Sequence, residues 1–93
     1  MFGKRIKTLR LSLGLNQIEF GKNLNVTKQS VSNWENGNIQ PSIDMLIKIS
    51  NTFSVSSDYL LGLDDKRTLD ANGLSDKQIS CLQLLINDLR KTK

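Results

Sequence analysis

The sequence predicts an all-α protein with five short helices, a polar linker and one C-terminal amphipathic helix. In each predicted helix, apolar residues recur three or four positions apart, which places them on one helix face. An Asn, Thr or Ser able to cap a helix precedes most of these segments, and Gly or Asn follows several of them. Within residues 17–37, a turn of a few residues joins two such helices, which predicts a helix-turn-helix unit.

The first helix is predicted over residues 3–13. Ile6, Leu9 and Leu13 form its apolar stripe, and Gly14 ends it. Three basic residues on its outward side could equally serve solubility or contact phosphates: Lys4, Arg5 and Lys7.

The second helix begins at Gln17. Asn16 can cap it, and Glu19 follows three residues later, the spacing of a capping box. Phe20 and Leu24 are four residues apart and therefore share one face.

The turn after this helix is predicted from four residues. Gly21 has no side chain, so another backbone can approach it. Asn25 tolerates the left-handed conformation that a sharp helix exit requires. Val26 is expected to face inward, and Thr27 can cap the next helix.

The third helix presents a polar face that contains no acidic residue. Val31 and Trp34 are three positions apart and face the core, Glu35 falls outside the polar face, and Gly37 can end the helix. The polar face itself consists of Lys28, Gln29, Ser32 and Asn33.

This polar face favours contact with DNA. The amides of Gln29 and Asn33 offer a donor beside an acceptor, the pattern that matches adenine N6 and N7 in the major groove, and Lys28 can meet a guanine or a phosphate. An ordinary solvated face, the alternative interpretation, more often mixes Glu with Lys, because opposite charges four apart stabilise an exposed helix.

Two further helices are predicted to complete the core. Pro41 cannot continue a helix and Ser42 can cap the next one, over residues 43–53, with three inward positions: Leu46, Ile49 and Phe53. Ser56 or Ser57 caps a short helix over residues 58–61, which Gly62 stops; its inward residues are Tyr59 and Leu60.

The C-terminal part differs in composition. Residues 64–74 are polar and predict a linker, after which Ser75 caps a last helix with Gln78 in capping-box position. The apolar stripe of this helix is the predicted dimerisation surface: Ile79, Leu82, Leu85, Ile86 and Leu89. The helix could fold back on its own domain or pair with a second copy, and pairing is favoured because five helices already close the core.

Residues 4–62 resemble the helix-turn-helix domain of the phage repressor and Cro family, also called XRE-type. The match rests on Arg10, residues 14–17, 29–32 and 34–37, Pro41 with Ser42, and residues 55–62. The resemblance implies a five-helix repressor-type domain over residues 1–63, followed by the linker 64–74 and a C-terminal helix segment 75–93. Gly21 and Asn25 depart from the usual Ala and Gly of the family, but each keeps the required small side chain or tolerated positive φ.

The resemblance also implies roles for residues outside the polar face. In lambdoid repressors, an Arg placed like Arg10 pairs with the Glu that is here Glu35, which ties the first helix to the third. Members of the family contact the sugar-phosphate chain through the loop that here holds Asn36, Asn38 and Gln40. Gln17, at the start of the second helix, is expected to contact a phosphate rather than to be a simple polar first residue.

Composition argues against an enzyme. There is no His, which removes the commonest metal ligand and general base, so no metal, cofactor or small-molecule ligand is predicted. The single Cys81 cannot form an internal disulfide and is expected to be a buried thiol in a cytoplasmic protein. No apolar run approaches the roughly 20 residues of a membrane span.

Charge and motif together predict a sequence-specific regulator that binds double-stranded DNA as a dimer on a palindromic operator. Residues 1–40 hold six basic and two acidic residues, the excess expected of a segment that approaches a polyanion. Repression by occluding a promoter is favoured over activation. The alternative from another class is a protein-interaction module, such as an antitoxin or anti-repressor partner, which the apolar stripe of the last helix would serve.

Overall fold

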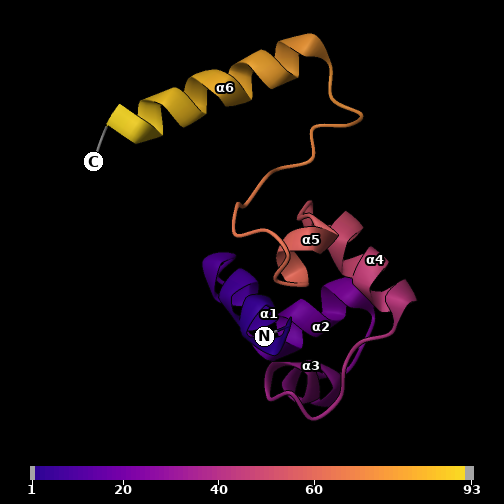
Figure 1. The fold of residues 1–93 in the computed structure, drawn as a ribbon. Helices are drawn as coiled ribbons and strands as arrows, with labels where there is room; N and C mark the ends of the chain where they lie inside the picture. The colour runs from indigo at the N-terminus through magenta and orange to yellow at the C-terminus, as the bar shows by residue number, and fades with distance from the viewer. Residues whose placement is uncertain (1, 92–93) are drawn as a thin grey trace.

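The computed structural model describes residues 2–91, and every regular element in that range is an α-helix. The six helices follow the predicted order (Figure 1): α1 (Phe2–Ser12), α2 (Gln17–Leu24), α3 (Lys28–Glu35), α4 (Ile43–Phe53), α5 (Ser57–Leu60) and α6 (Asp76–Lys91). The all-α class and the five-helix unit with one more helix are therefore confirmed. The predicted C-terminal segment includes residues 92 and 93, which lie outside the described residues.

Helices α1 to α5 pack around one apolar core. Apart from Leu13, each helix contributes its predicted inward positions, so the spacing of three and four in the sequence corresponds to burial in the structure. Leu46 and Phe53 are partly buried against this core, and Phe53 stacks on Phe20 with ring centroids 4.6 Å apart. The buried apolar residues are Ile6, Leu9, Phe20, Leu24, Val31, Trp34, Ile49, Val55, Tyr59 and Leu60.

The helix caps are those that the sequence predicts. At α2, the Asn16 side chain accepts from the Glu19 backbone N–H and the Glu19 carboxylate accepts from the Asn16 N–H, a complete capping box. A hydroxyl accepts from the backbone N–H three residues on at each of four further helices, through Thr27, Ser42, Ser56 and Ser75. Local side chains therefore decide where these helices begin.

One predicted core residue of α1 is wrong. Leu13 lies beyond the last helical residue, Ser12, and its side chain is 43% exposed. The chain turns at Gly14, whose φ is +71°, and Leu15 packs against the core instead. The four-residue spacing from Leu9 to Leu13 predicted burial only if the helix continued through Leu13, and α1 ends at Ser12.

Arg5 was expected to point outward, but its side chain is partly covered by contacts with the linker and α5. Arg5 Nη2 lies 2.7 Å from Asp65 Oδ1, and the guanidinium carbon lies 4.4 Å from the centre of the Tyr59 ring. The hydrogen bond to Asp65 raises the pKa of Arg5, which desolvation partly opposes. Arg67 lies 5.8 Å from the same ring and donates to Ser12 Oγ at 3.2 Å. These contacts hold the start of the linker against α1 and α5.

Helix α6 stands apart from the bundle (Figure 1), and no residue of α6 is buried. Its apolar stripe is correspondingly open: Ile79 is partly exposed, and the other four residues range from 37% exposure at Ile86 to 60% at Leu89. Cys81 was predicted to be a buried thiol and is exposed, because no core lies against its helix. Over residues 2–91, no helix combines the length and apolar character needed to cross a bilayer.

Candidate nucleic-acid interface

The turn between α2 and α3 is closed by two residues with unusual backbone requirements. Asn25 adopts φ 60° and ψ 41°, and its N–H bonds back to the carbonyls of Gly21 and Lys22. A Cβ on Gly21 would lie 2.7 Å from the Val26 carbonyl oxygen, closer than real Cβ contacts. Glycine at position 21 therefore allows the turn to fold against α2, which fixes α3 relative to α2.

Glu35, the last residue of α3, joins three parts of the fold. Its carboxylate accepts from Arg10 Nε at 2.6 Å, from Arg10 Nη2 at 3.1 Å and from Gln17 Nε2 at 3.2 Å. Arg10 Nη1 also donates to the Leu15 carbonyl at 3.0 Å. The side chains of Arg10 and Glu35 are only 10% and 3% exposed. The ion pair that the family resemblance implies is thus present, nearly buried, and shared with α2 through Gln17.

A close backbone approach also fixes α1 against α3. A Cβ on Gly3 would collide with the carbonyl oxygen of Trp34 and would lie 2.7 Å from that of Glu35. The sequence did not predict this contact at Gly3. The available signal was a glycine at the first position of a predicted helix, where a missing side chain permits a close packing contact.

The polar face of α3 is accessible. Lys28 and Gln29 are exposed, and Ser32 and Asn33 are partly exposed. Gln29 Nε2 donates to Asn33 Oδ1 at 3.2 Å, so the two amides lie side by side with donor and acceptor atoms still available. The amide surface predicted from the sequence therefore faces solvent rather than the core.

The loop after α3 continues this surface. Asn36, Asn38 and Gln40 are all exposed. Asn36 Nδ2 donates to Ser32 Oγ at 3.3 Å, and the Asn38 backbone N–H donates to the Asn33 carbonyl at 2.9 Å. The loop is thus hydrogen-bonded directly to the residues of the polar face.

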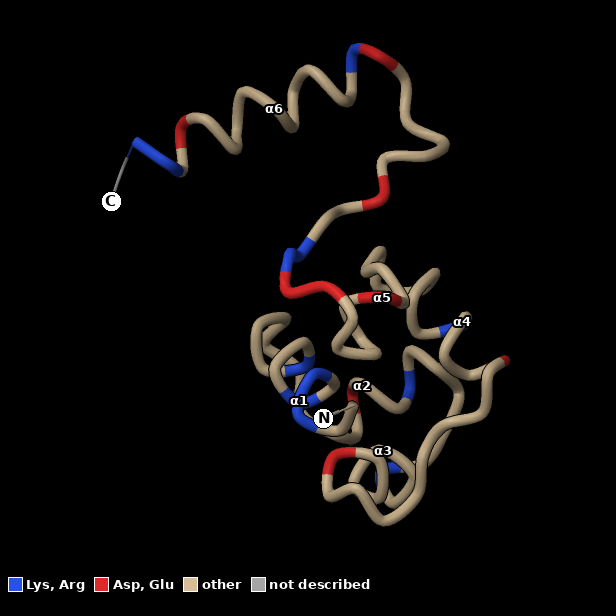
Figure 2. The backbone as a smooth tube through the Cα atoms, viewed as in Figure 1, with Lys and Arg blue, Asp and Glu red and all other residues tan. Residues whose placement is uncertain are grey.

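Basic groups gather on the same part of the chain. Lys and Arg lie along α1 (Figure 2), and α2 and α3 carry Lys22 and Lys28. A surface hollow lies between the start of α2 and the start of α3; it is lined by Arg10, Asn16, Gln17, Ile18 and Lys28. Both helix starts carry partial positive charge, so this hollow is suited to an anionic group.

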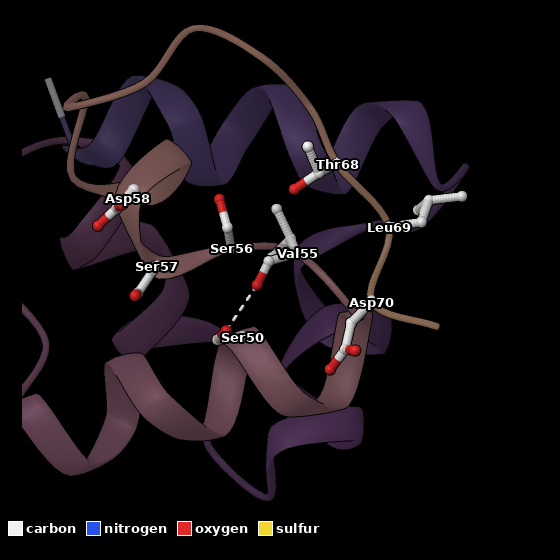
Figure 3. A pocket seen from close by; sticks show the side chains of 8 residues that line it. All are labelled: Ser50, Val55, Ser56, Ser57, Asp58, Thr68, Leu69 and Asp70. Atoms are coloured by element: carbon white, nitrogen blue, oxygen red, sulfur yellow. Dashed lines mark hydrogen bonds between the residues drawn. The ribbon is translucent and has the colours of Figure 1, made fainter. Parts of the chain in front are cut away.

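A second hollow, drawn in Figure 3, lies between the linker and α4–α5 and offers no catalytic arrangement. Its polar side chains are serines, Thr68, Asp58 and Asp70, and the Ser50 hydroxyl donates to the Val55 carbonyl at 2.6 Å. Among residues 2–91, no group of three His, Cys, Asp or Glu side chains could hold a metal ion.

Comparison with known proteins identifies the family. The family model for the helix-turn-helix domain matches residues 6–60, more than half of the chain. This chain belongs to the helix-turn-helix family of the XRE type. The match spans α1 to α5 and therefore contains the polar face, the α2–α3 turn and the Arg10–Glu35 pair.

Relatives of this chain include proteins named as transcriptional regulators and one named as an antitoxin, PezA of Streptococcus pneumoniae, which is 36% identical over 64 residues. The chain is 38% identical over 78 residues to the HTH-type transcriptional regulator ImmR of Bacillus subtilis, covering 84% of this chain and 61% of ImmR. The chain thus spans about three fifths of that relative's length.

Two solved structures share the fold. One is the P22 c2 repressor in complex with a synthetic operator, with TM-score 0.64 and 33% identity over 69% of this chain and 97% of that chain. The other is the SinR–SinI protein complex, with TM-score 0.62 and 30% identity over the whole of both chains.

Proposed function

We propose that this protein is a transcriptional regulator that binds double-stranded DNA sequence-specifically, acting as a dimer on a palindromic operator and most simply as a repressor. The observation that carries the proposal is the acid-free amide face of α3, which is exposed to solvent. The nearly buried Arg10–Glu35 ion pair holds the end of α3 against α1. The likeness to a c2 repressor solved on its operator supports it.

Each predicted contact has a role in this proposal. The side chains of the polar face read base edges in the major groove: Lys28, Gln29, Ser32 and Asn33. The loop residues Asn36, Asn38 and Gln40 contact the sugar-phosphate chain. The Gln17 side-chain amide is hydrogen-bonded to Glu35. We therefore assign the phosphate contact at this position to the free backbone N–H groups at the start of α2, beside Lys28.

The dimer places two α3 helices in successive major grooves, about 34 Å apart on one face of the duplex. The apolar stripe of α6 supplies the contact between copies, since it is open in the single chain. We place this XRE-type regulator in the cytoplasm, and its proposed role requires neither catalysis nor a cofactor.

Selection of bound sites from random duplex DNA tests the proposal. We expect a recovered palindrome whose half-sites are centred about one duplex turn apart. Recovery of no preferred sequence, at physiological salt and with ample competitor DNA, would refute sequence-specific binding.

A second candidate is a protein-interaction module that uses the same fold mainly to bind another protein. The open stripe of α6 and the likeness to a chain solved as part of a protein complex favour it. The same competitor experiment separates the two, because an interaction module would not retain a short operator under those conditions.

A further inference from the structure

Both ends of α6 carry acidic and basic residues, and one opposite-charge pair, Asp76 and Arg90, flanks its apolar stripe. Asp76 and Lys77 lie in the first turn, and Asp88, Arg90 and Lys91 lie in the last turn. Between these ends run Ile79, Leu82, Ile86 and Leu89, whose 3-4-3 spacing forms the seam of a two-helix coiled coil. We infer that two copies of this chain pair their α6 helices antiparallel, a geometry that rests on the proposed dimer and specifies it.

The seam closes in this orientation. If the pair is centred on residue 84, Ile79 faces Leu89 of the second copy and Leu82 faces Ile86 of the second copy. Leu85 lies beside the seam near the centre and meets its own counterpart. Every residue of the predicted dimerisation surface then loses exposed apolar area, which is the main driving force for association.

The charges distinguish antiparallel from parallel pairing. Asp76 and Arg90 are two heptads apart, so they flank the seam on the same side of the helix. Antiparallel pairing brings Asp76 beside Arg90 of the second copy, and symmetry makes this contact twice. Parallel pairing keeps Asp76 away from Arg90 of the second copy, and it aligns helix dipoles that repel each other.

The linkers favour the same arrangement. A helix of 16 residues is about 24 Å long, so antiparallel pairing separates the two α6 starts by about that distance. Parallel pairing leaves them about 10 Å apart, the usual distance between packed helix axes. Contacts of Asp65 and Arg67 hold the first part of each linker on its bundle. The remaining residues, 68–74, then diverge toward separate half-sites.

Distances between spin labels on the full chain test the orientation. In a Cys81→Ser background, a label is attached to a cysteine at Lys77 or at Leu84, two exposed positions one heptad apart. In an antiparallel pair the Leu84 labels are level, whereas the Lys77 labels are offset by about 21 Å along the helices. We assume a lateral separation of about 20–25 Å between the labels. Combined with the offset along the helices, it makes the Lys77 distance between copies exceed the Leu84 distance by roughly 8–9 Å.

The outcomes separate the orientation from the dimer. Equal distances at both positions would overturn antiparallel pairing while retaining a dimer. If no dipolar coupling between labels on different copies is detected, and sedimentation equilibrium of the same samples shows a monomer, α6 pairing is overturned altogether. Sequence-specific DNA binding is then still tested separately by the selection of operator sites.

Substitution of the charges gives a second measurement. Asp76→Asn and Arg90→Gln are each expected to weaken dimerisation about threefold, because each substitution removes both symmetry-related ion pairs of the dimer. The double variant is expected to weaken dimerisation no more than either single variant. Losses that multiply in the double variant would show that the two side chains do not meet, which contradicts the antiparallel register.

Discussion

Glu35 links the outward-facing chemistry of the third helix to the core. Its carboxylate accepts from Arg10 and Gln17 while its side chain is 3% exposed. Buried charges of this kind are stable only when they are paired, so removal of one partner strands the other. The sequence identified this pair only through the family resemblance, because a separation of 25 positions has no local signature. The contribution of Gln17 to it became visible only in the structure.

The first prediction concerns this pair. Arg10→Met and Glu35→Leu should each lower the free energy of unfolding by about 3–5 kcal/mol, since each leaves one buried charge unpaired. The double variant should lose no more than either single variant, because no unpaired charge remains. Denaturant unfolding of the four proteins measures this cycle. Losses that simply add would contradict a coupled pair.

The second prediction concerns Gln29, whose side chain hydrogen-bonds to Asn33 on the surface. Gln29→Ala should cost about 1–3 kcal/mol of binding on the preferred operator and relax base preference at one position. Stability should change by less than about 0.5 kcal/mol, since the residue is exposed. Titration of the selected operator and its single-base variants measures both effects.

Asn51→Ala serves as the matched control, because Asn51 is an exposed amide on α4, outside the proposed interface. It should leave operator affinity unchanged. An equal loss for Gln29→Ala on every sequence would show that Gln29 positions the protein without reading a base.

At the scale of elements, most helix boundaries follow from short-range signals. Asn16, Thr27, Ser42 and Ser75 cap the helices that they were predicted to cap, because a cap bonds to an N–H only three residues away. The packing of α1 against α3 is different. It depends on Gly3 meeting carbonyl groups more than thirty positions later, and no local pattern specifies that contact.

The third prediction tests this contact. Gly3→Ala should destabilise the protein by about 1–2 kcal/mol, because overpacking against the carbonyl oxygens of Trp34 and Glu35 outweighs the higher helix propensity of Ala. Lys4→Ala, at the exposed neighbouring position, should stay within about 0.5 kcal/mol of the parent. Thermal and denaturant unfolding compare the two. A stabilised Gly3→Ala protein would show that α1 can move away from α3 at little cost.

For the whole molecule, the decisive feature is the separation of α6 from the five-helix bundle. No residue of α6 is buried, so the stability of the bundle should not depend on its apolar stripe. Association of two chains should depend on it strongly, because that stripe is the surface proposed for pairing. Folding and assembly are therefore separable by mutation.

The fourth prediction uses this separation. Leu82→Asp should weaken dimerisation by at least about 100-fold, since two buried leucines are lost per dimer at roughly 1.5–3 kcal/mol each. The melting temperature of the bundle should not change, as Leu82 lies outside the core. Sedimentation equilibrium and thermal melting report these two effects.

Leu84→Asp is the control, since Leu84 is 66% exposed on the same helix and lies outside the seam. It should leave the dimer constant within a few-fold. Equal effects of the two substitutions would show that the stripe does not define the interface.

The sequence by itself determined the helices, their caps, the left-handed exit at Asn25 and the amide face of α3, because each depends on residues within about one helical turn. Only the tertiary structure decided that Leu13 is exposed, that Arg5 leaves the outward face for Tyr59 and Asp65, and that Cys81 lies open on α6. Such features depend on contacts between residues far apart in the chain, or on their absence, and periodicity along the chain carries no information about them.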